Sequence, residues 1–393
     1  MSGWLQLNSA VRTGELCYSD GDLKEVAWAR NMMCSIPRPP RHLKAYTALC
    51  LALAALALTA PAPAADDVRP IRLRVAGGLA ELGQYVRHEQ PFWTQRVPEL
   101  TGGRVRAEIT PFDRAGIRGQ EMLQLVRLGV VPFGNVLLSL AAGEDPELNG
   151  IDLPVLNPDV ATLRRTTALW RPRLASLLRH RYGVELLAVY TYPAQVVFCR
   201  SPFSGLADLA GRRIRTSSVG QSELMSGVGA LPVVIPFAET LGALRTGVVE
   251  CAVTAAMSGN AVGLPEATSH LSRLAVGWGV SVFVANRSMW LSLPEEVRTP
   301  LREGLGKLEG EIWTSAEIET ENGLACNAGA ATCLDGRRGH MTVVEERGQD
   351  EALRTQLLRD VVLPAWVERC GADCAENWNR YIAPALGLWA GEQ

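Results

Sequence analysis

Residues 201–260 read SPFSGLADLAGRRIRTSSVGQSELMSGVGALPVVIPFAETLGALRTGVVECAVTAAMSGN. Short apolar runs alternate here with helix-like segments, which predicts strand, helix, strand, helix and strand in succession. Arg215 stands where the strand expected at 212–216 meets the next helix. Ligands of α/β sheets bind at such strand ends, and a helix N-terminus attracts anions. Because a guanidinium can hold a carboxylate through two parallel hydrogen bonds, the stretch predicts a small-anion site.

The same alternation of strands and helices extends on both sides of this stretch. Strands are expected at 71–76, 105–109, 136–140, 185–190 and 280–285, and helices at 86–100, 119–127 and 162–182. This order predicts an α/β fold with an open, largely parallel sheet that has helices on both faces.

Two sequence patterns indicate where helices begin. Ser218–Gln221 and Ser292–Glu295 each fit a capping box, in which a serine and a residue three positions later satisfy free N–H groups. The second box opens a helix that we expect to run to about Asn322, which is unusually long.

The segment 41–65 has the form of a secretory signal peptide. A basic stretch precedes the apolar run 45–60, which is short for a membrane span, and Ala62-Pro63-Ala64 is a cleavage pattern. We therefore expect export to the periplasm with cleavage near Ala64, the alternative being an uncleaved membrane anchor. Residues 1–32 are interpreted as a mis-assigned translation start, because initiation at Met32 or Met33 gives a basic segment of ordinary length.

The composition is that of an ordinary α/β protein, with 47% hydrophobic and 20% charged residues. The roughly 330 residues after the expected cleavage point suffice for two domains with cores of their own. The net charge of −2 gives no reason to expect nucleic acid as a partner. Lysine occurs only at positions 24, 44 and 307, so arginine is the common cation and Arg215 must be argued from its position.

Six cysteines follow the expected cleavage point, namely Cys199, Cys251, Cys326, Cys333, Cys370 and Cys374. In an oxidising compartment close pairs form disulfides. Cys326 and Cys333 flank a loop of small residues and are expected to be joined. A bridge between Cys370 and Cys374 is less favourable if that stretch is a regular helical turn. Neither spacing matches a zinc site, so we expect no metal and no cofactor.

Motifs of enzymes are missing from the sequence. We find no G-x-S-x-G elbow, no H-E-x-x-H and no phosphate-binding G-x-x-x-x-G-K-[ST]. The histidines after the expected cleavage point, at 88, 180, 270 and 340, are far apart and show no ligand spacing. The pattern therefore favours a binding protein over an enzyme.

The run 206–255 resembles the signature region of TRAP-transporter solute receptors of the DctP-type family. The residues that carry the resemblance are Asp208-Leu209, Gly211, Arg213-Ile214-Arg215, Gly229-Ala230, Pro232, Pro236-Phe237, Glu239, Ala243-Leu244 and the run 246–250. Weaker agreement covers most of the chain, for example TGGRV near residue 103 and SLPEEVR at 292–298.

The resemblance implies a type II periplasmic-binding-protein-like fold, with two α/β domains, a cleft between them and a long bridging helix. Domain I is expected at 66–190 plus about 281–320, and domain II at 191–280 plus about 321–393. The resemblance further implies a monomeric periplasmic receptor that delivers a small organic acid to a membrane permease with a small and a large subunit.

The resemblance also implies site residues. Arg215 corresponds to the carboxylate anchor of the family, and Thr254 to a ligand-facing position that is often asparagine. Many members carry a second arginine where this chain has Ala194 or Gln195, so a monocarboxylate with a neutral body is expected.

Four further residues are site candidates, each with a structural alternative. Phe237 packs on the ligand or belongs to the core, and Trp278 stacks on the ligand or forms the hinge. Ser218 donates to the carboxylate or serves only as a helix cap. Asn260, with Ser258, lies just past the strand end of Thr254 and is a ligand contact or a turn residue.

Two other functions fit the sequence. One is an exported ligand-sensing receptor for another transporter or a signalling system, and the other is an exported enzyme on the same fold. A neighbouring pair of permease subunits identifies the TRAP receptor, whereas turnover of a bound ligand identifies the enzyme.

Overall fold

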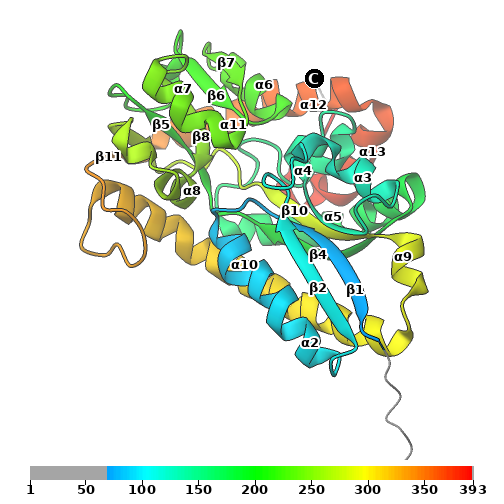
Figure 1. Cartoon of the computed structure of the whole chain (residues 1–393). Coiled ribbons are helices and arrows are strands. Elements are labelled where there is room, and N and C mark those ends of the chain that lie inside the picture. The colour runs from blue at the N-terminus through cyan, green and yellow to red at the C-terminus, as the bar shows by residue number, and fades with distance from the viewer. Residues whose placement is uncertain (1–68, 392–393) are drawn as a thin grey trace, which may run out of the picture. The chain divides into compact units, whose positions relative to one another are not determined.

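The computed structural model describes residues 69–391, and Figure 1 shows how their helices and strands are arranged. The expectations for residues 1–65, the mis-assigned start and the signal peptide cleaved near Ala64, lie outside the described residues. Between residues 69 and 391 no helix combines the length and the apolar character of a membrane span.

Two mixed sheets form the framework. Sheet A has the order β2-β1-β3-β10-β4, with the strands β1 (Ile71–Gly77), β2 (Val105–Pro111), β3 (Phe133–Leu137), β4 (Val184–Thr191) and β10 (Val280–Asn286). Sheet B has the order β11-β9-β5-β8-β6-β7, with the strands β5 (Gln195–Cys199), β6 (Arg213–Thr216), β7 (Leu231–Val234), β8 (Cys251–Ala255), β9 (His270–Ser272) and β11 (Thr342–Val344).

The expectation of one largely parallel sheet is wrong. β10 runs antiparallel to both β3 and β4, and β5 runs antiparallel to both β8 and β9. The reason is topological, since the chain leaves sheet A after β4 and returns to it with β10. Each crossing strand therefore enters its sheet against the direction of its neighbours. The expected domain boundaries near 190 and 280 stay a prediction.

Helices cover both sheets. The first part of the chain contains η1 (Gln84–Glu89), η2 (Phe92–Arg96), α2 (Val97–Leu100), η3 (Gly119–Glu121), α3 (Met122–Arg127), α4 (Leu138–Ala141), η4 (Pro146–Asn149) and α5 (Val160–Tyr182). The middle contains η5 (Leu206–Leu209), α6 (Val219–Gly227), η6 (Phe237–Glu239), α7 (Thr240–Thr246), α8 (Ala256–Ala261), η7 (Leu264–Glu266) and α9 (Arg287–Ser292). The last part contains α10 (Glu295–Ala328), α11 (Gly348–Leu357), η8 (Leu358–Val362), α12 (Leu363–Cys370), α13 (Ala372–Tyr381) and α14 (Ala383–Leu386).

The long helix α10 runs past both sheets, as Figure 1 shows, and it is longer than expected. It continues to Ala328 because the next residue, Gly329, adopts the left-handed conformation that ends helices. The proposed capping box at its start is wrong, since α10 begins after Pro294 without a side-chain cap and the Ser292 hydroxyl donates to the carbonyl of Met289.

Aromatic side chains pack between sheet A and the helical segment η2, which contains Trp93. Trp93 lies 5.2 Å from Phe283 of β10 and 6.2 Å from Phe133 of β3, measured between ring centroids. Each large aromatic removes roughly 150–250 Å² from water, so this cluster dominates the local core energy. A second cluster joins Trp170 of α5 to Trp366 of α12 at 6.5 Å.

Three disulfides are present among the described residues. Cys326 and Cys333 are joined, as the sequence predicts, and Cys199 of β5 is joined to its neighbour Cys251 of β8. Cys370 and Cys374 are joined as well. The expectation of poor geometry there rested on a regular helical turn, whereas Gly371 has a φ of 90° and separates α12 from α13.

Candidate functional site

Arg215 lies near the end of β6, inside sheet B, and only 3% of its surface is exposed. The side chain is held by backbone alone. Its Nε donates to the carbonyl of Ile235 at 2.9 Å, and its Nη1 donates to the carbonyl of Val253 at 2.7 Å. Two carbonyls from flanking segments therefore fix the guanidinium in place.

This guanidinium is a buried cation without a counter-ion. Burial lowers the pKa of Arg215 to about 10, and no acidic side chain among residues 69–391 offsets that effect. It is still charged at neutral pH. No residue in the same range accepts a hydrogen bond from its Nη2. Because an uncompensated buried charge is costly, this atom is suited to an anionic ligand.

Hydroxyl and amide groups gather at the start of α6, directly after β6. Ser218 is the N-cap, and its Oγ accepts from the N–H of Gln221 at 3.3 Å. The Gln221 Oε1 accepts from the N–H and the hydroxyl of Ser217, at 2.9 and 3.0 Å. The predicted capping box is therefore shifted by one residue, because glutamine reaches back to Ser217 and not to Ser218.

Gln195 lies beside this helix start. Its Oε1 accepts a hydrogen bond from the Gln221 side chain, and its own N–H donates to the carbonyl of Gly277 at 2.7 Å. The preceding residue, Ala194, is buried. The segment at which the resemblance implies a second arginine in other receptors thus contributes a neutral amide and a methyl group in this chain.

Thr254 and Phe237 lie close in sequence to the two carbonyls that hold Arg215. Thr254 follows Val253 in β8 and is buried, and no described residue bonds its hydroxyl. Phe237 follows Ile235 by two residues, opens η6 and is partly exposed. The contacts of Arg215 therefore place these segments around the guanidinium.

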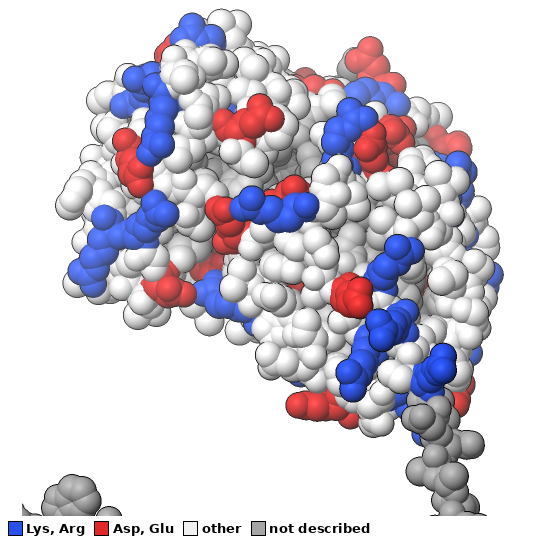
Figure 2. Space-filling model, in the orientation of Figure 1, with Lys and Arg blue, Asp and Glu red and all other residues white. Residues whose placement is uncertain are grey.

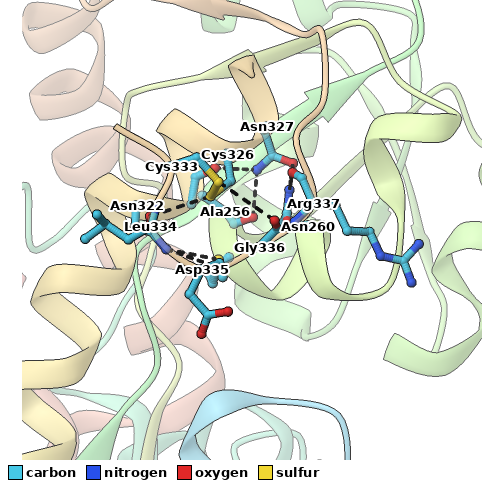
Figure 3. The surroundings of a disulfide bond; sticks show 12 residues. Ala256, Asn260, Asn322, Cys326, Asn327, Cys333, Leu334, Asp335, Gly336 and Arg337 are labelled. Atoms are coloured by element: carbon cyan, nitrogen blue, oxygen red, sulfur yellow. Dashed lines mark hydrogen bonds between the residues drawn. A yellow bond between two sulfur atoms is a disulfide. The ribbon is translucent and has the colours of Figure 1, made fainter. Parts of the chain in front are cut away.

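Trp278 and Asn260 have structural contacts. The indole N–H of Trp278 donates to the carbonyl of Asn157 at 2.9 Å, in the segment that returns to sheet A. The Asn260 amide donates to the carbonyl of Arg337 and accepts from its N–H, both at 2.8 Å. Figure 3 shows Asn260 beside Gly336 and Arg337, in the segment that follows the disulfide Cys326–Cys333. Both side chains are occupied in holding the fold.

A cavity of about 420 Å³ lies where η1, α8 and α10 meet, and Arg215 does not line it. Its walls include Gln84, Arg87, Tyr192, Met257, Ser258, Asn260, Ser315 and Glu319. Arg87 spans it, pairing with Glu319 and donating from Nη1 to Asp335 Oδ2 at 2.8 Å. Of the site residues predicted from the sequence, Asn260 and Ser258 line this cavity. The residues of η1 that line it were not predicted.

A buried carboxylate at the end of β1 was also missed. Glu89 is fully buried and accepts from the N–H of Gly78 at 2.6 Å, from Gln84 Nε2 at 2.8 Å and from Asn135 Nδ2 at 2.5 Å. Burial raises the pKa of this carboxyl. Gln84 lies five residues from Glu89 and Gly78 eleven, whereas Asn135 lies 46 residues away, and these residues form no pattern that marks a buried carboxylate in the sequence.

The residues described above do not include a metal-binding cluster, since no three or more His, Cys, Asp or Glu side chains between residues 69 and 391 come together suitably. Figure 2 shows basic and acidic side chains interspersed over one face, without a large area of a single sign. The candidate chemistry is that of a single buried cation beside hydroxyl and amide groups.

A family comparison decides what kind of protein carries this site. Residues 83–327 match the family described as bacterial extracellular solute-binding protein, family 7. The chain belongs to this family. The predicted family and the predicted fold class, type II periplasmic-binding-protein-like, are confirmed.

Relatives and solved structures agree with membership of family 7. The C4-dicarboxylate-binding periplasmic protein DctP of Rhodobacter capsulatus is 25% identical over 281 residues, which are 70% of this chain and 80% of DctP. The structure of DctP7, an extracytoplasmic solute receptor of Bordetella pertussis that binds pyroglutamic acid, is 23% identical with a TM-score of 0.69. The match includes 79% of this chain and 99% of the DctP7 chain. A TRAP periplasmic solute binding protein of Rhodoferax ferrireducens, with bound malonate, is 20% identical with a TM-score of 0.68, and 80% of this chain covers 99% of it.

Proposed function

We propose that this family 7 protein is the periplasmic solute-binding subunit of a TRAP transporter and captures a small organic acid at Arg215. The observation that carries the proposal is the buried guanidinium with no acidic partner and a free Nη2 among residues 69–391. The relatives named above, a dicarboxylate-binding protein and receptors with pyroglutamate or malonate, support a carboxylate as ligand.

The ligand class follows from the charges at the site. A carboxylate takes the free Nη2 of Arg215, and the hydroxyls of Thr254 and Ser218 and the ring of Phe237 complete the site. Arg354, the other buried arginine of the described range, pairs with Glu351. Residues 194 and 195 are neutral and supply no second cation, so Arg215 can pair with only one carboxylate. The ligand is therefore a monocarboxylate with an uncharged body.

The mechanism is binding and delivery without chemical change. The two sheets close on the acid by rotation at the crossing segments, and the closed form is recognised by the permease, which has a small and a large membrane subunit. The receptor is monomeric and has no nucleic-acid partner. Its periplasmic location rests on family membership and on the signal-like segment 41–65.

A thermal-shift screen of organic acids tests the proposal. Binding to the folded state alone raises the free energy of unfolding by about 2.7 kcal/mol when the ligand is in hundredfold excess over Kd. Residues 66–393, expressed for export, should be stabilised by one or more monocarboxylates. Stabilisation by sugars, amines or metals alone refutes the proposal. Mass spectrometry of the co-purified ligand identifies the acid, and a mass change on incubation would indicate an enzyme.

A further inference from the structure

A second buried charge lies away from Arg215, at the place where the chain returns to sheet A. Asp152 follows η4 and is only 5% exposed. Its Oδ1 accepts from the N–H of Trp278 at 3.1 Å, and its Oδ2 accepts from those of Gly279 and Val280, at 2.7 and 3.0 Å. No cation among residues 69–391 pairs with it. Three successive backbone dipoles hold this carboxylate.

The backbone around Asp152 is built for one conformation. Gly279 has a φ of +83°, which strains any residue with a side chain, and a Cβ there would lie 2.9 Å from Nε2 of Gln195 and displace that amide. Val155, three residues after Asp152, has a φ of 57°, which is costly for a β-branched residue. Its N–H donates to the carbonyl of Val276 at 3.0 Å, and its carbonyl accepts from Arg354 at 2.6 Å.

Asp152 holds one of the two short segments that lead directly from a strand of one sheet to a strand of the other, the third crossing being the path from β10 to β11 through α9 and α10. Residues 273–279 lead from β9 to β10, and residues 192–194 lead from β4 to β5. The two connections bond each other, because the N–H of Tyr192 donates to the carbonyl of Gly279 at 3.4 Å. Gln195, the first residue of β5, also donates to the carbonyl of Gly277 at 2.7 Å and accepts from the N–H of Val276 at 2.8 Å. Fixing residues 278–280 therefore fixes both connections.

A line of hydrogen bonds leads from this crossing to the Arg215 site. The side chain of Gln195 accepts from Gln221, and Gln221 accepts from the N–H of Ser217 at 2.9 Å. Ser217 is two residues from Arg215, at the end of the same strand. The position of the guanidinium relative to sheet A thus depends on contacts that begin at Asp152.

We propose that Asp152 is a positioning residue for ligand capture, whose carboxylate holds the crossing, and through Gln195 and Gln221 the Arg215 site, in the binding geometry. The inference rests on the proposed function. A carboxylate is required because both oxygens accept, whereas the amide of asparagine would turn an NH₂ group toward at least one N–H of residues 278–280.

Asp152→Asn in the exported protein tests the inference, with the acid that gives the largest thermal shift as the probe. If the binding geometry is populated about one tenth as often, the calorimetric Kd rises about tenfold. Amide hydrogen exchange, which needs no ligand, should become faster at residues 278–280 and also at 215–221. Asp152→Glu, which keeps both acceptors on a longer side chain, should fall between wild type and Asp152→Asn.

Asp350→Asn is the matched control. Asp350 is buried like Asp152 and accepts from the backbone N–H of Arg347 at 2.9 Å, but it also pairs with the Arg347 guanidinium at 3.7 Å and lies outside both strand connections. Its variant should keep the Kd within about twofold and the exchange at 215–221 unchanged. Asp152→Asn with an unchanged Kd and unchanged exchange at 215–221 overturns the inference, as does an equal effect of both variants. If no acid binds the wild type, the proposed function fails, and the exchange experiment still decides the coupling.

Discussion

Arg215 and Asp152 are both buried charges without a counter-ion in the described part of the chain, yet the molecule uses them differently. The guanidinium of Arg215 donates to two carbonyls and keeps Nη2 without a partner. The carboxylate of Asp152 receives three backbone N–H groups, which occupy both of its oxygens. Burial opposes the charge in both cases, lowering the pKa of Arg215 to about 10 and raising that of Asp152 to about 6.

The difference teaches how a binding group is distinguished from a structural one. Burial alone marks neither, because both residues are over nine-tenths buried. What separates them is unused hydrogen-bonding capacity, since Nη2 of Arg215 has no acceptor among residues 69–391, whereas both oxygens of Asp152 are occupied. The predictions below test whether this distinction holds, beginning with the largest expected effect.

Arg215→Ala should weaken binding of the acid by more than about a hundredfold, because removing one partner of a buried ion pair costs roughly 3–5 kcal/mol. Arg215→Lys should recover only part, since an ammonium cannot reproduce the two-pronged geometry. Arg213→Ala is the control, because Arg213 precedes on the same strand but is exposed and pairs with Glu250 at 3.2 Å. Calorimetric titration measures all three, and an Arg215→Ala affinity within about fivefold of wild type would contradict the comparison.

Removing the disulfides should change the stability of the fold without changing the charge at the Arg215 site. Cys199–Cys251 ties β5 to β8 across 52 residues, whereas Cys326–Cys333 spans 7. Loop-closure entropy predicts a loss of about 4 kcal/mol for the first double serine variant and about 2–3 kcal/mol for the second. Denaturant unfolding measures both. Because Cys199–Cys251 lies in the strands under the site, only its loss should also weaken binding; equal effects on stability would show that loop length is not the cause.

The pH dependence of stability should reveal the cost of the Asp152 charge. Its pKa is raised from 3.8 to about 6, so between these values the folded chain holds a proton that the unfolded chain has lost. Stability contributed by Asp152 is therefore largest near pH 4 and falls as the pH rises through about 6, by on the order of 3 kcal/mol at most.

Denaturant unfolding of wild type and Asp152→Asn from pH 4 to pH 7 isolates this contribution, since the other acids cancel in the difference. The stability advantage of wild type should shrink with rising pH. A difference that is flat or grows over this range would show that the three N–H groups outweigh burial. A carboxylate whose charge reduces stability at neutral pH is consistent with the positioning role.

The fold class and the family were predictable because their signals are local, and the anion site at Arg215 stays a prediction. Arg215 stands in a strand-to-helix pattern that fits within about fifty residues, and its segment predicts both the sheet and the family. The short strands β5, β9 and β11 were missed, because three to five residues carry little periodicity. The antiparallel entries of β5 and β10 follow from crossings that no local pattern records.

The long-range contacts of the site had no sequence signal. Asp152 meets Trp278 across 126 residues, and Arg87 meets Glu319 across 232. Trp278 was expected either on the ligand or in the hinge, and the contact of its indole N–H with the carbonyl of Asn157, across 121 residues, is one that its neighbours in sequence do not indicate. Asn260 likewise faces a loop that follows it by more than seventy residues. Side chains committed to distant backbone cannot be told from ligand contacts by their neighbours in sequence.

The smallest expected effect concerns Arg87, an exposed counterpart to the two buried charges. It joins η1, which packs beside sheet A, to Asp335, which lies two residues after the disulfide Cys326–Cys333. The Asp335 side chain is 74% exposed, and ion pairs of such exposure contribute about 0–1 kcal/mol. Asp335→Asn should therefore change the free energy of unfolding by less than about 1 kcal/mol, with an effect that disappears at high salt. Asp360→Asn, whose exposed side chain pairs only with the adjacent Arg359 at 2.6 Å, is the control. Denaturant unfolding measures both variants. If Asp335→Asn lowered the free energy of unfolding by more than about 2 kcal/mol, exposed ion pairs would stabilise the protein as much as the buried contacts of Asp152 do. The contrast between buried and exposed charges would then fail.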